Sequence, residues 1–492
     1  MPKEDSRPVS STSSKGSIWT QMDEDMSEKD SGMAMPRRHT FSISLSSQRP
    51  PPPRRLAMLC LHWFTTYRIL IALTFIANMA VLAVLVNRNR PFTLAEPLIA
   101  TAVNLFVAVL VRQEDIINLS FSLVAKTPIW LPLWFRTTMA DFHHYGGIHV
   151  GSAMAALLWY IFFVHVNTIF FLDSLNAHTA RVWMWVDIAT CYSFLVSIVL
   201  VCITAHPKLR MRFHNTFEHT HRFGGWIAMM VLWANTGVSS ITQHTKPLYL
   251  NPAVWLLAAT TMLIIMPWTR IRRVLITASL LSSREVRISF PYKNMPYSRT
   301  MRFSHSPLLE WHAFATIPTP DHASAFVLVS QAGDWTKALI QNPPSHIWLR
   351  RPPAANFLCV APLFKSLLLV ATGAGIGPMI SLLSSPIIAK MKARGTIIRV
   401  LWCVYDPEAP HWQFVLAAIR AVDPNPYIYD SSDGRPDIAG ETGWVMREKG
   451  IEAAMVVSNP KVTREVVEGV KGWGGAAFGA VVKRRMWWLR DV

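Results

Sequence analysis

Residues Leu367–Leu383 read LLLVATGAGIGPMISLL, and they decide how the carboxyl-terminal part of the chain folds. An apolar run leads into the turn Gly373-Ala374-Gly375-Ile376-Gly377-Pro378, and a second apolar run follows. The pattern predicts a strand, a phosphate-cradling turn and a helix, because glycines let the backbone approach a pyrophosphate and a helix start offers free N–H groups. The Lys-Ser/Thr of a P-loop is absent, which disfavours an ATPase. The candidate nucleotide-binding residues here are Gly373, Gly375, Gly377 and Pro378.

The composition indicates a membrane protein rather than a nucleic-acid-binding protein. The chain has 492 residues, of which 51% are hydrophobic, and a formal net charge of +18. Its Lys and Arg residues sit beside hydrophobic segments and form no aromatic-basic patch, so we expect no nucleic-acid partner. The five cysteines show no CxxC or metal-binding spacing and imply no disulfide framework. Residues 1–55 are rich in Ser, Pro and charge, and we expect a disordered tail.

Six apolar segments follow the tail, and most approach the roughly 20 residues that cross a bilayer. They lie near Tyr67–Val86, Thr93–Val111, Tyr145–Leu172, Val182–Thr204, Phe223–Gln243 and Pro252–Trp268. A further apolar stretch, residues 116–134, is broken by Lys126, Pro128 and Pro132, and we interpret it as interfacial or re-entrant. Basic residues concentrate after the second, fourth and sixth segments, which places both termini in the cytoplasm. We therefore expect a multi-pass protein of the plasma membrane or an endomembrane, with the lipid bilayer as its partner.

From about residue 284 the pattern changes. Residues 284–290 and 325–330 alternate like strands between Pro and Gly, which predicts a small antiparallel barrel. Strand-like runs at 367–371, 396–405 and 453–458 alternate with helical stretches at 378–394 and 411–422, which predicts a doubly wound α/β domain. The expected parts are a tail (1–55), a six-helix transmembrane bundle (56–275), a β-barrel (276–362) and a nucleotide-binding α/β domain (363–492).

This order of parts resembles the ferric reductase and NADPH oxidase superfamily, in which a haem-carrying six-helix domain precedes a flavin-binding barrel and a nicotinamide-binding domain. Four stretches resemble superfamily motifs in the right order: Trp311–Ala315, Gly333–Thr336, Gly373–Pro378 and Gly434–Pro436. The likeness is strongest to TmpA-type integral membrane proteins of filamentous fungi, and similar domains also occur beside peptide-synthetase-like modules. The stretches that resemble the TmpA-type proteins are Phe142–Gly147, Thr220–Gly225 and Val457–Thr463.

The resemblance implies two cofactor sites. It places FAD, in a ferredoxin-reductase-like barrel, near His312, Phe314, Arg350 and Arg351. It places NAD(P)H at the glycine turn together with Gly434 and Arg435. The chain departs from the superfamily where the glycine-rich flavin-phosphate turn is replaced by Arg350-Arg351-Pro352-Pro353-Ala354, which keeps charge for a pyrophosphate but lacks the glycines. Ser458-Asn459-Pro460 likewise replaces the usual Cys-Gly-Pro near the hydride path.

The resemblance also implies haem, but the histidine pattern is incomplete. The superfamily holds two haems between two helices, each helix carrying two histidines nearly four turns apart on one face. Here Leu158 stands fourteen residues beyond His144, and Asn235 stands fourteen residues beyond His221, so the outer pair is broken. One hypothesis is a single haem b between His144 or His149 and His221. The other is that these are interfacial histidines that hydrogen-bond or cap helix ends.

Two functional hypotheses follow. The first is a membrane-bound flavin-dependent oxidoreductase that passes electrons from NAD(P)H through FAD to a membrane or small-molecule acceptor, with a degraded haem relay. The second is a non-enzymatic, reductase-like membrane protein that acts in signalling or partner docking. A transporter has little support, since we expect no charged or broken helix at the membrane midplane.

Overall fold

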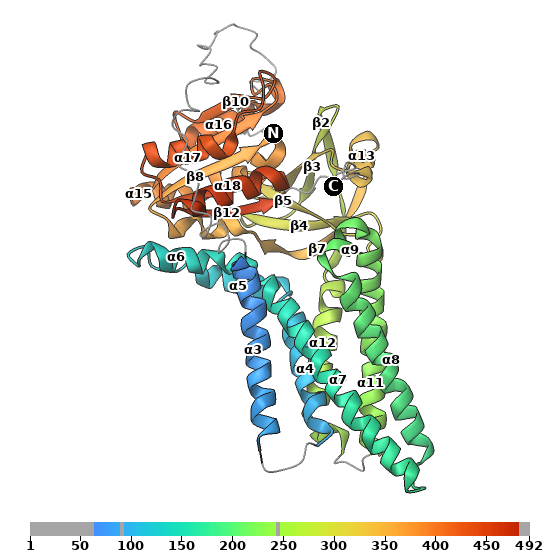
Figure 1. Cartoon of the computed structure of the whole chain (residues 1–492). Coiled ribbons are helices and arrows are strands. Elements are labelled where there is room, and N and C mark those ends of the chain that lie inside the picture. The colour runs from blue at the N-terminus through green and yellow to red at the C-terminus, as the bar shows by residue number, and fades with distance from the viewer. Residues whose placement is uncertain (1–62, 89–92, 243–246, 482–492) are drawn as a thin grey trace, which may run out of the picture.

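Three structural parts follow one another in a computed structural model of the chain, which describes residues 63–88, 93–242 and 247–481. Long helices form a bundle, and an antiparallel sheet and a parallel sheet lie beside one another at one end of that bundle (Figure 1). The expected tail, residues 1–55, lies outside the described residues.

Helices form in all six apolar segments of the sequence. They are α3 (Thr66–Val86), α4 (Ala95–Leu110), α7 (Gly146–Asn176), α8 (Val182–Thr204), α11 (Gly225–Thr242) and α12 (Pro252–Thr269). Among the described residues, α3, α7, α8 and α12 are each long and apolar enough to cross a membrane, and the total reaches six if two pairs bent by 70° count as one span each. One bent pair is α4 with α5 (Glu114–Val124), whereas the other belongs to the parallel-sheet domain and contributes to its core.

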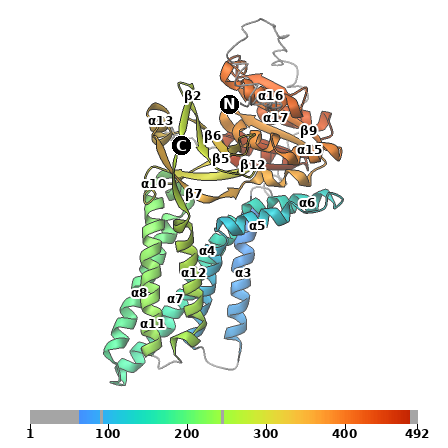
Figure 2. The same ribbon diagram turned by 180° about the vertical axis from the view of Figure 1, so that it is seen from behind.

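Short helices lie across the sheet-facing end of the bundle. They are α5, α6 (Leu133–Ala140), η2 (Asp141–His144), α9 (Pro207–Arg212), α10 (His214–His219) and the π-helical turn η3 (Thr220–Gly224), while η4 (Leu248–Leu250) lies before α12. The stretch that we expected to be interfacial thus becomes α5, at the end of the bundle that faces the sheets, and α6, which projects beyond the bundle along the parallel-sheet domain (Figure 2).

The antiparallel sheet has seven strands in the order β1-β7-β4-β5-β6-β3-β2. Only Ile276 separates β1 from β2, yet these strands occupy opposite edges, so the sheet curls toward closure as expected for a barrel. Its strands are β1 (Ile271–Leu275), β2 (Thr277–Ser282), β3 (Glu285–Pro291), β4 (Arg299–Ser304), β5 (His312–Pro318), β6 (Ser324–Ser330) and β7 (His346–Ala355), with α13 (Asp334–Gln341) between β6 and β7.

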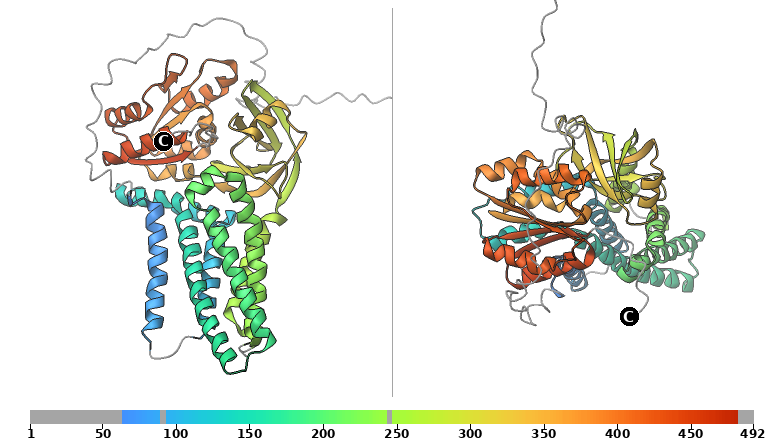
Figure 3. Two further views of the ribbon diagram at one scale, coloured as in Figure 1. Left: turned by 45° about the vertical axis from the view of Figure 1, so that its right-hand side comes forward. Right: turned by 90° about the horizontal axis from the view of Figure 1, so that it is seen from above.

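The parallel sheet has the order β10-β9-β8-β11-β12, which is the predicted doubly wound topology. Its strands are β8 (Ser366–Thr372), β9 (Ile397–Val404), β10 (Tyr427–Asp430), β11 (Ala453–Ser458) and β12 (Ala476–Val481). Helices cover both faces (Figure 3), namely α14 (Ile376–Leu383), α15 (Pro386–Ala393) and α16 (Gln413–Val422) on one and α17 (Ile438–Glu448) and α18 (Pro460–Gly472) on the other. Short 3-10 turns η5 (Phe357–Leu363), η6 (Gly373–Gly375) and η7 (Pro410–Trp412) complete the domain.

The helical stretch that we predicted over residues 378–394 forms, but as two helices rather than one. It breaks at Ser384 and Ser385 into α14 and α15, and Pro386 begins α15. A proline disfavours helical backbone at the residue before it but suits the first helical turn, so the break follows from Pro386.

A partly buried ion pair joins the parallel-sheet domain to the segment between α5 and α7. Arg136, whose side chain is 2% exposed, donates from Nη1 and Nη2 to the two carboxylate oxygens of Glu452 at 3.0 and 3.1 Å. Arg136 also donates to the Leu363 carbonyl at 2.6 Å. Burial raises the pKa of Glu452, but hydrogen bonds from Arg136 and the Lys365 N–H outweigh it and hold the pKa below its ordinary value.

Helices α3 and α7 pack closely because two glycines on α7 face α3. A Cβ at Gly147 would clash with the carbonyl oxygen of Tyr67, and one at Gly151 would lie 2.8 Å from the Cβ of Thr74. Gly147 and Gly151 are four residues apart, which is the small-residue spacing that brings membrane helices together. Gly147 and Gly151 therefore serve the close packing of α7 on α3.

Substituting Gly147 by Ala should destabilise the bundle by roughly 1–3 kcal/mol, since the new methyl group has no room against the α3 backbone. The measurement is the thermal unfolding midpoint of the detergent-purified protein. Gly237→Ala on α11 is the matched control, because a Cβ there meets nothing within 4 Å. Equal midpoints for the two variants would contradict close α3–α7 packing.

Acid should weaken the contact of Arg136 with Glu452. A carboxyl group whose folded pKa is depressed stabilises the fold above its ordinary pKa of 4.5 and loses that stabilisation as the pH falls through the lower folded value. Glu452→Gln should therefore lower the unfolding midpoint near neutral pH and flatten its decline below about pH 4.5. Glu448→Gln, at an exposed pair with Lys449, should do neither. If the unfolding midpoint of the Glu452 variant declined below about pH 4.5 as steeply as that of the natural chain, the stabilising role of this ion pair would be contradicted.

Candidate functional site

The glycine turn lies at the carboxyl end of β8, beside β11. Gly373 has a φ of 53°, a left-handed conformation that glycine adopts without strain. Gly375 approaches β11 so closely that a Cβ would clash with the Val457 carbonyl oxygen. The hydroxyls of Thr372 and Ser458, at the ends of β8 and β11, are 2.5 Å apart. The turn therefore lies at the point where the strand order reverses, which is where open α/β sheets bind ligands.

Helix α14, which begins within the glycine turn, packs on the antiparallel sheet. A Cβ at Gly377 would lie 3.8 Å from Leu328 of β6, and the Ser298 N–H donates to Ser381 Oγ at 2.9 Å. Pro378 occupies the first turn of α14, where its missing N–H costs no helical hydrogen bond. The candidate nucleotide edge and the curled sheet thus meet directly.

Gly434 and Arg435 reach the same edge of the parallel sheet. They follow β10, where Gly434 has a φ of 121°, and Arg435 is exposed. Burial raises the pKa of the Cys403 thiol, and the nearby Arg435 cation partly opposes this rise. Cys403 pairs with Thr372 in register, so Arg435 lies near the strand end that begins the glycine turn.

His312 and Phe314 form an aromatic stack that the structure completes with Trp335. The His312 and Trp335 rings are stacked with centroids 4.1 Å apart, and Phe314 stacks on Trp335 at 5.8 Å. Glu310 accepts hydrogen bonds from His312 Nε2 and Trp335 Nε1, both at 2.7 Å. The predicted flavin motif and the Gly333–Thr336 segment therefore do meet in space.

The two predicted phosphate-binding arginines lie in different surroundings. Arg350 and Arg302 both pair with the carboxylate of Glu114 on α5, whose side chain is 7% exposed. Arg351 instead lies over the ring of Tyr292, with its guanidinium 4.7 Å from the ring centroid. Neighbouring residues on a strand point to opposite faces, so Arg350 and Arg351 do not form one site.

Helix α5 makes further contacts that the sequence analysis missed. Asn118 Oδ1 accepts hydrogen bonds from Arg299 Nη1 and the Ala355 N–H, both at 2.7 Å, while its Nδ2 donates to the Pro353 carbonyl at 3.0 Å. Asp115 pairs with Arg270. The sequence feature that could have indicated these contacts is the pair of adjacent carboxylates, Glu114 and Asp115, at the start of an otherwise apolar stretch.

Several buried polar atoms near this contact have no partner among the described residues. They are Arg299 Nε, Arg350 Nε, Asn356 Nδ2 and Ser298 Oγ. A buried polar group without a partner costs about 1–3 kcal/mol, so such a group in a native fold asks for an explanation. A flavin phosphate or ring edge would satisfy these atoms, and they therefore fit FAD, although Glu114 already engages the charged ends of Arg302 and Arg350.

His149 and His221 face one another across α7 and η3. Their ring centroids are 6.1 Å apart. Metal–nitrogen bonds of about 2.0–2.1 Å place two imidazoles on opposite sides of one ion at roughly this separation. His149 Nδ1 donates to the Ala108 carbonyl at 2.8 Å, which leaves Nε2 as the free base, and His221 Nδ1 is buried without a described partner. His149 and His221 therefore fit as the two residues that would hold one haem iron.

His144 belongs to a different cluster. Asp141, His143 and His144 present ligand atoms within 4.8 Å of one another, and the two histidine rings are 3.9 Å apart. Lys471 of α18 forms an ion pair with Asp141 at 3.3 Å, so the carboxylate of this cluster already has a cationic partner. Burial, followed by the charge of His143, lowers the pKa of His144 to about 4. The structure thus separates His144 from the His149–His221 pair.

A polar network stands where the outer haem pair is missing. Asn235 accepts a hydrogen bond from the Tyr160 hydroxyl at 2.9 Å and donates to Asp187 Oδ1 at 3.0 Å. Asn167 and Ser239 also donate to Asp187, which is 3% exposed. The network joins α7, α8 and α11, and Asp187 is a buried acidic side chain that the sequence analysis did not single out.

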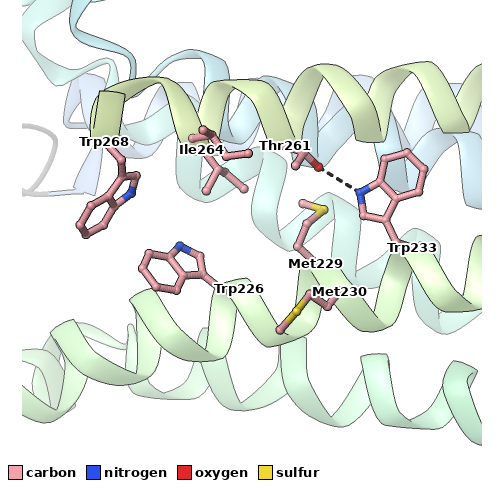
Figure 4. A pocket seen from close by; sticks show the side chains of 8 residues that line it. Trp226, Met229, Met230, Trp233, Thr261, Ile264 and Trp268 are labelled. Carbon is pink, nitrogen blue, oxygen red and sulfur yellow. Dashed lines mark hydrogen bonds between the residues drawn. The ribbon is translucent and has the colours of Figure 1, made fainter. Parts of the chain in front are cut away.

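An apolar groove of about 290 Å³ lies between α11 and α12. Trp226 and Trp268 meet edge to face at one end, and Trp233 donates to Thr261 Oγ1 at 3.0 Å further along (Figure 4). Met229, Met230 and Ile264 line the space between them. The only side-chain hydroxyl in its lining, that of Thr261, is already engaged, so the groove suits apolar contact alone.

The relatives found by comparison with known proteins are named as reductases. The family described as the C-terminal domain of adenylate-forming reductase 03009 matches residues 357–484. Adenylate-forming reductase 03009 of Coprinopsis cinerea (strain Okayama-7) is 34% identical over 426 residues, which are 85% of this chain and 40% of that protein. Adenylate-forming reductase 06235 of the same strain is 33% identical over 427 residues, with the same coverage. These relatives are named as adenylate-forming reductases, not as TmpA-type membrane proteins.

Two solved structures align with parts of the chain. A ferredoxin NADP+ reductase from Neisseria gonorrhoeae, with bound FAD and NADP, has a TM-score of 0.35 and 12% identity over 43% of this chain and 98% of its own. A flavohemoglobin from Malassezia yamatoensis, with bound FAD and heme, has a TM-score of 0.37 and 13% identity over 65% of this chain and 94% of its own. Over most of its length, the chain is similar to part of two longer reductases, of which it spans about 40%.

Proposed function

We propose that this chain is a membrane-embedded, flavin-dependent reductase that takes electrons from a nicotinamide nucleotide. The observation that carries the proposal is the position of the glycine turn. It lies at the switch point of the parallel sheet, and its helix α14 packs on β5 and β6 of the curled sheet. A nucleotide at the turn and a flavin on that sheet would therefore be neighbours.

Different residues of this chain would bind the nucleotide and the flavin. The turn from Gly373 to Pro378 would hold the pyrophosphate of the nucleotide. The unpartnered donors of Arg299, Arg350 and Asn356 would hold the flavin, and Phe314 and Trp335 would offer it an aromatic surface. A bound flavin supplies the change from hydride transfer to single-electron transfer.

His149 and His221 would hold one haem b at the sheet-facing end of the bundle. A haem there supplies a one-electron carrier close to the flavin domain. The polar network around Asp187 replaces the second histidine pair, so electrons would leave to a membrane or small-molecule acceptor without crossing the whole bilayer.

The bundle would cross the plasma membrane or an endomembrane with both termini in the cytoplasm. The apolar lengths of α3, α7, α8 and α12 and the basic loops at the sheet-facing end support this arrangement. Both relatives bear the name reductase. We extend only that part of their name to this chain, since it spans about 40% of their length.

A second candidate function is a non-enzymatic one, in which the reductase-like domains dock partners or transmit signals. The engagement of Arg302 and Arg350 by Glu114 favours it, because those charges are then satisfied without any cofactor.

The absorption spectrum of the purified full chain separates these functions. We expect flavin absorbance together with a Soret band, and loss of the Soret band in both His149→Ala and His221→Ala, because each variant removes one of the two residues that would hold the haem. His144→Ala should keep the Soret band and serves as the control.

The other outcomes of this measurement also discriminate. Flavin without a Soret band would contradict the haem assignment alone. Neither chromophore, with no nucleotide-dependent dye reduction, would leave only the non-enzymatic function.

Removing the charge of Glu114 should strengthen flavin binding. Glu114→Gln frees Arg302 and Arg350 for an anionic ligand, and a charge-assisted hydrogen bond is worth about 1.5–3 kcal/mol, or roughly tenfold or more in affinity. Flavin titration of apoprotein in detergent measures the effect. Asp115→Asn removes the adjacent charge, which pairs with Arg270 instead, and should change affinity little. Weaker flavin binding in the Glu114 variant would show that this carboxylate supports the flavin site.

A further inference from the structure

An acidic rim borders the candidate nucleotide edge at the carboxyl ends of β9 and β10. Asp406 follows β9 by two residues, is exposed and has a φ of 45°. Asp430 ends β10, and its Oδ1 accepts hydrogen bonds from the N–H groups of Asp406 at 3.1 Å and Ser432 at 2.8 Å. These bonds tie the two strand-end loops together and fix the backbone from which the Asp406 side chain projects.

The register of the sheet places this rim next to the glycine turn. Thr372 of β8 pairs with Cys403 of β9, and Val404 of β9 pairs with Asp430 of β10. Trp402 of β9 donates to the Gly373 carbonyl at 3.1 Å, which fixes the turn against that strand. Neighbouring strands are about 4.8 Å apart, so the end of β9, two residues before Asp406, lies roughly one strand spacing from the start of the turn.

A dinucleotide on the turn would bring its adenosine ribose to Asp406. The curled sheet flanks the turn through Gly377 and α14. A nucleotide whose nicotinamide half faced that sheet would have its adenosine half on the side of β9, because the adenosine ribose adjoins the pyrophosphate. Tyr405 is 71% exposed at the same strand end and offers a stacking face for adenine. Within the described residues the Asp406 carboxylate accepts no hydrogen bond, so it is available to a ribose hydroxyl.

The charge of the rim opposes a phosphate on that ribose. Loop residues 405–409 and 431–437 contain one basic side chain, Arg435, against Asp406, Glu408, Asp433 and Asp437. The Arg435 cation and the Asp430 carboxylate act on the pKa of the Cys403 thiol in opposite directions, so charges of both signs lie near the end of β9. A 2′-phosphate would therefore meet net negative charge, whereas a 2′-hydroxyl can donate to a carboxylate.

We propose that Asp406 selects NADH over NADPH at the nucleotide site. The inference depends on the proposed function, because it concerns the same site. A ribose hydroxyl donating to an ionised carboxylate, together with repulsion of a 2′-phosphate, should make NADH bind at least about tenfold more tightly than NADPH.

Parallel titrations of NADH and NADPH against the purified full chain, followed by tryptophan-to-nicotinamide energy transfer, test the proposal. Asp406→Asn should weaken NADH binding, strengthen NADPH binding and reduce the preference about tenfold. Glu448→Gln, which removes an exposed carboxylate at the end of α17, should leave the preference unchanged.

The failures are distinguishable from one another. Equal affinities, or tighter NADPH binding, would overturn the selectivity while leaving the proposed function in place. Parallel loss of both nucleotides in Asp406→Asn would overturn the selective role of Asp406. If neither nucleotide binds the natural chain, the proposed function fails and this inference fails with it.

Discussion

The carboxylate of Glu114 connects the helical bundle to the curled sheet, and the relation between the two parts depends on it. It is nearly buried and pairs with both Arg302 and Arg350, so little water screens the interaction. Asn118 extends the contact to backbone groups of β7. Helix α5 is bent by 70° from the apolar helix α4, and its contacts lie on β4 and β7, the strands that carry the unpartnered Nε atoms of Arg299 and Arg350.

The two ends of the bundle differ in their chemistry. At the sheet-facing end, His149 and His221 face each other with nitrogen atoms left free for a ligand. Further along the same helices, Tyr160, Asn235 and Asp187 satisfy one another by hydrogen bonds. A satisfied polar network holds helices together, so the two ends of the bundle differ in whether their polar groups are already engaged.

Local sequence patterns predicted much of this architecture. The apolar runs, the alternating strands and the glycine turn depend on short-range backbone preferences, and the helices and strands lie close to the expected positions. The errors had local physical causes. Pro386 broke a helix that periodicity alone would continue. Strand alternation separates Arg350 from Arg351, a consequence that the sequence already contained.

The sequence by itself determined the order of the parts, the doubly wound topology and the position of the glycine turn, because these follow from hydrophobic periodicity and the conformational freedom of glycine. Only the tertiary structure decided which histidine faces His221 and which carboxylate meets Arg350. His144 and His149 are separated by little more than one helical turn, so their partners depend on helix rotation and packing. Glu114 meets Arg350 across 236 residues of chain, and no local pattern encodes such a contact.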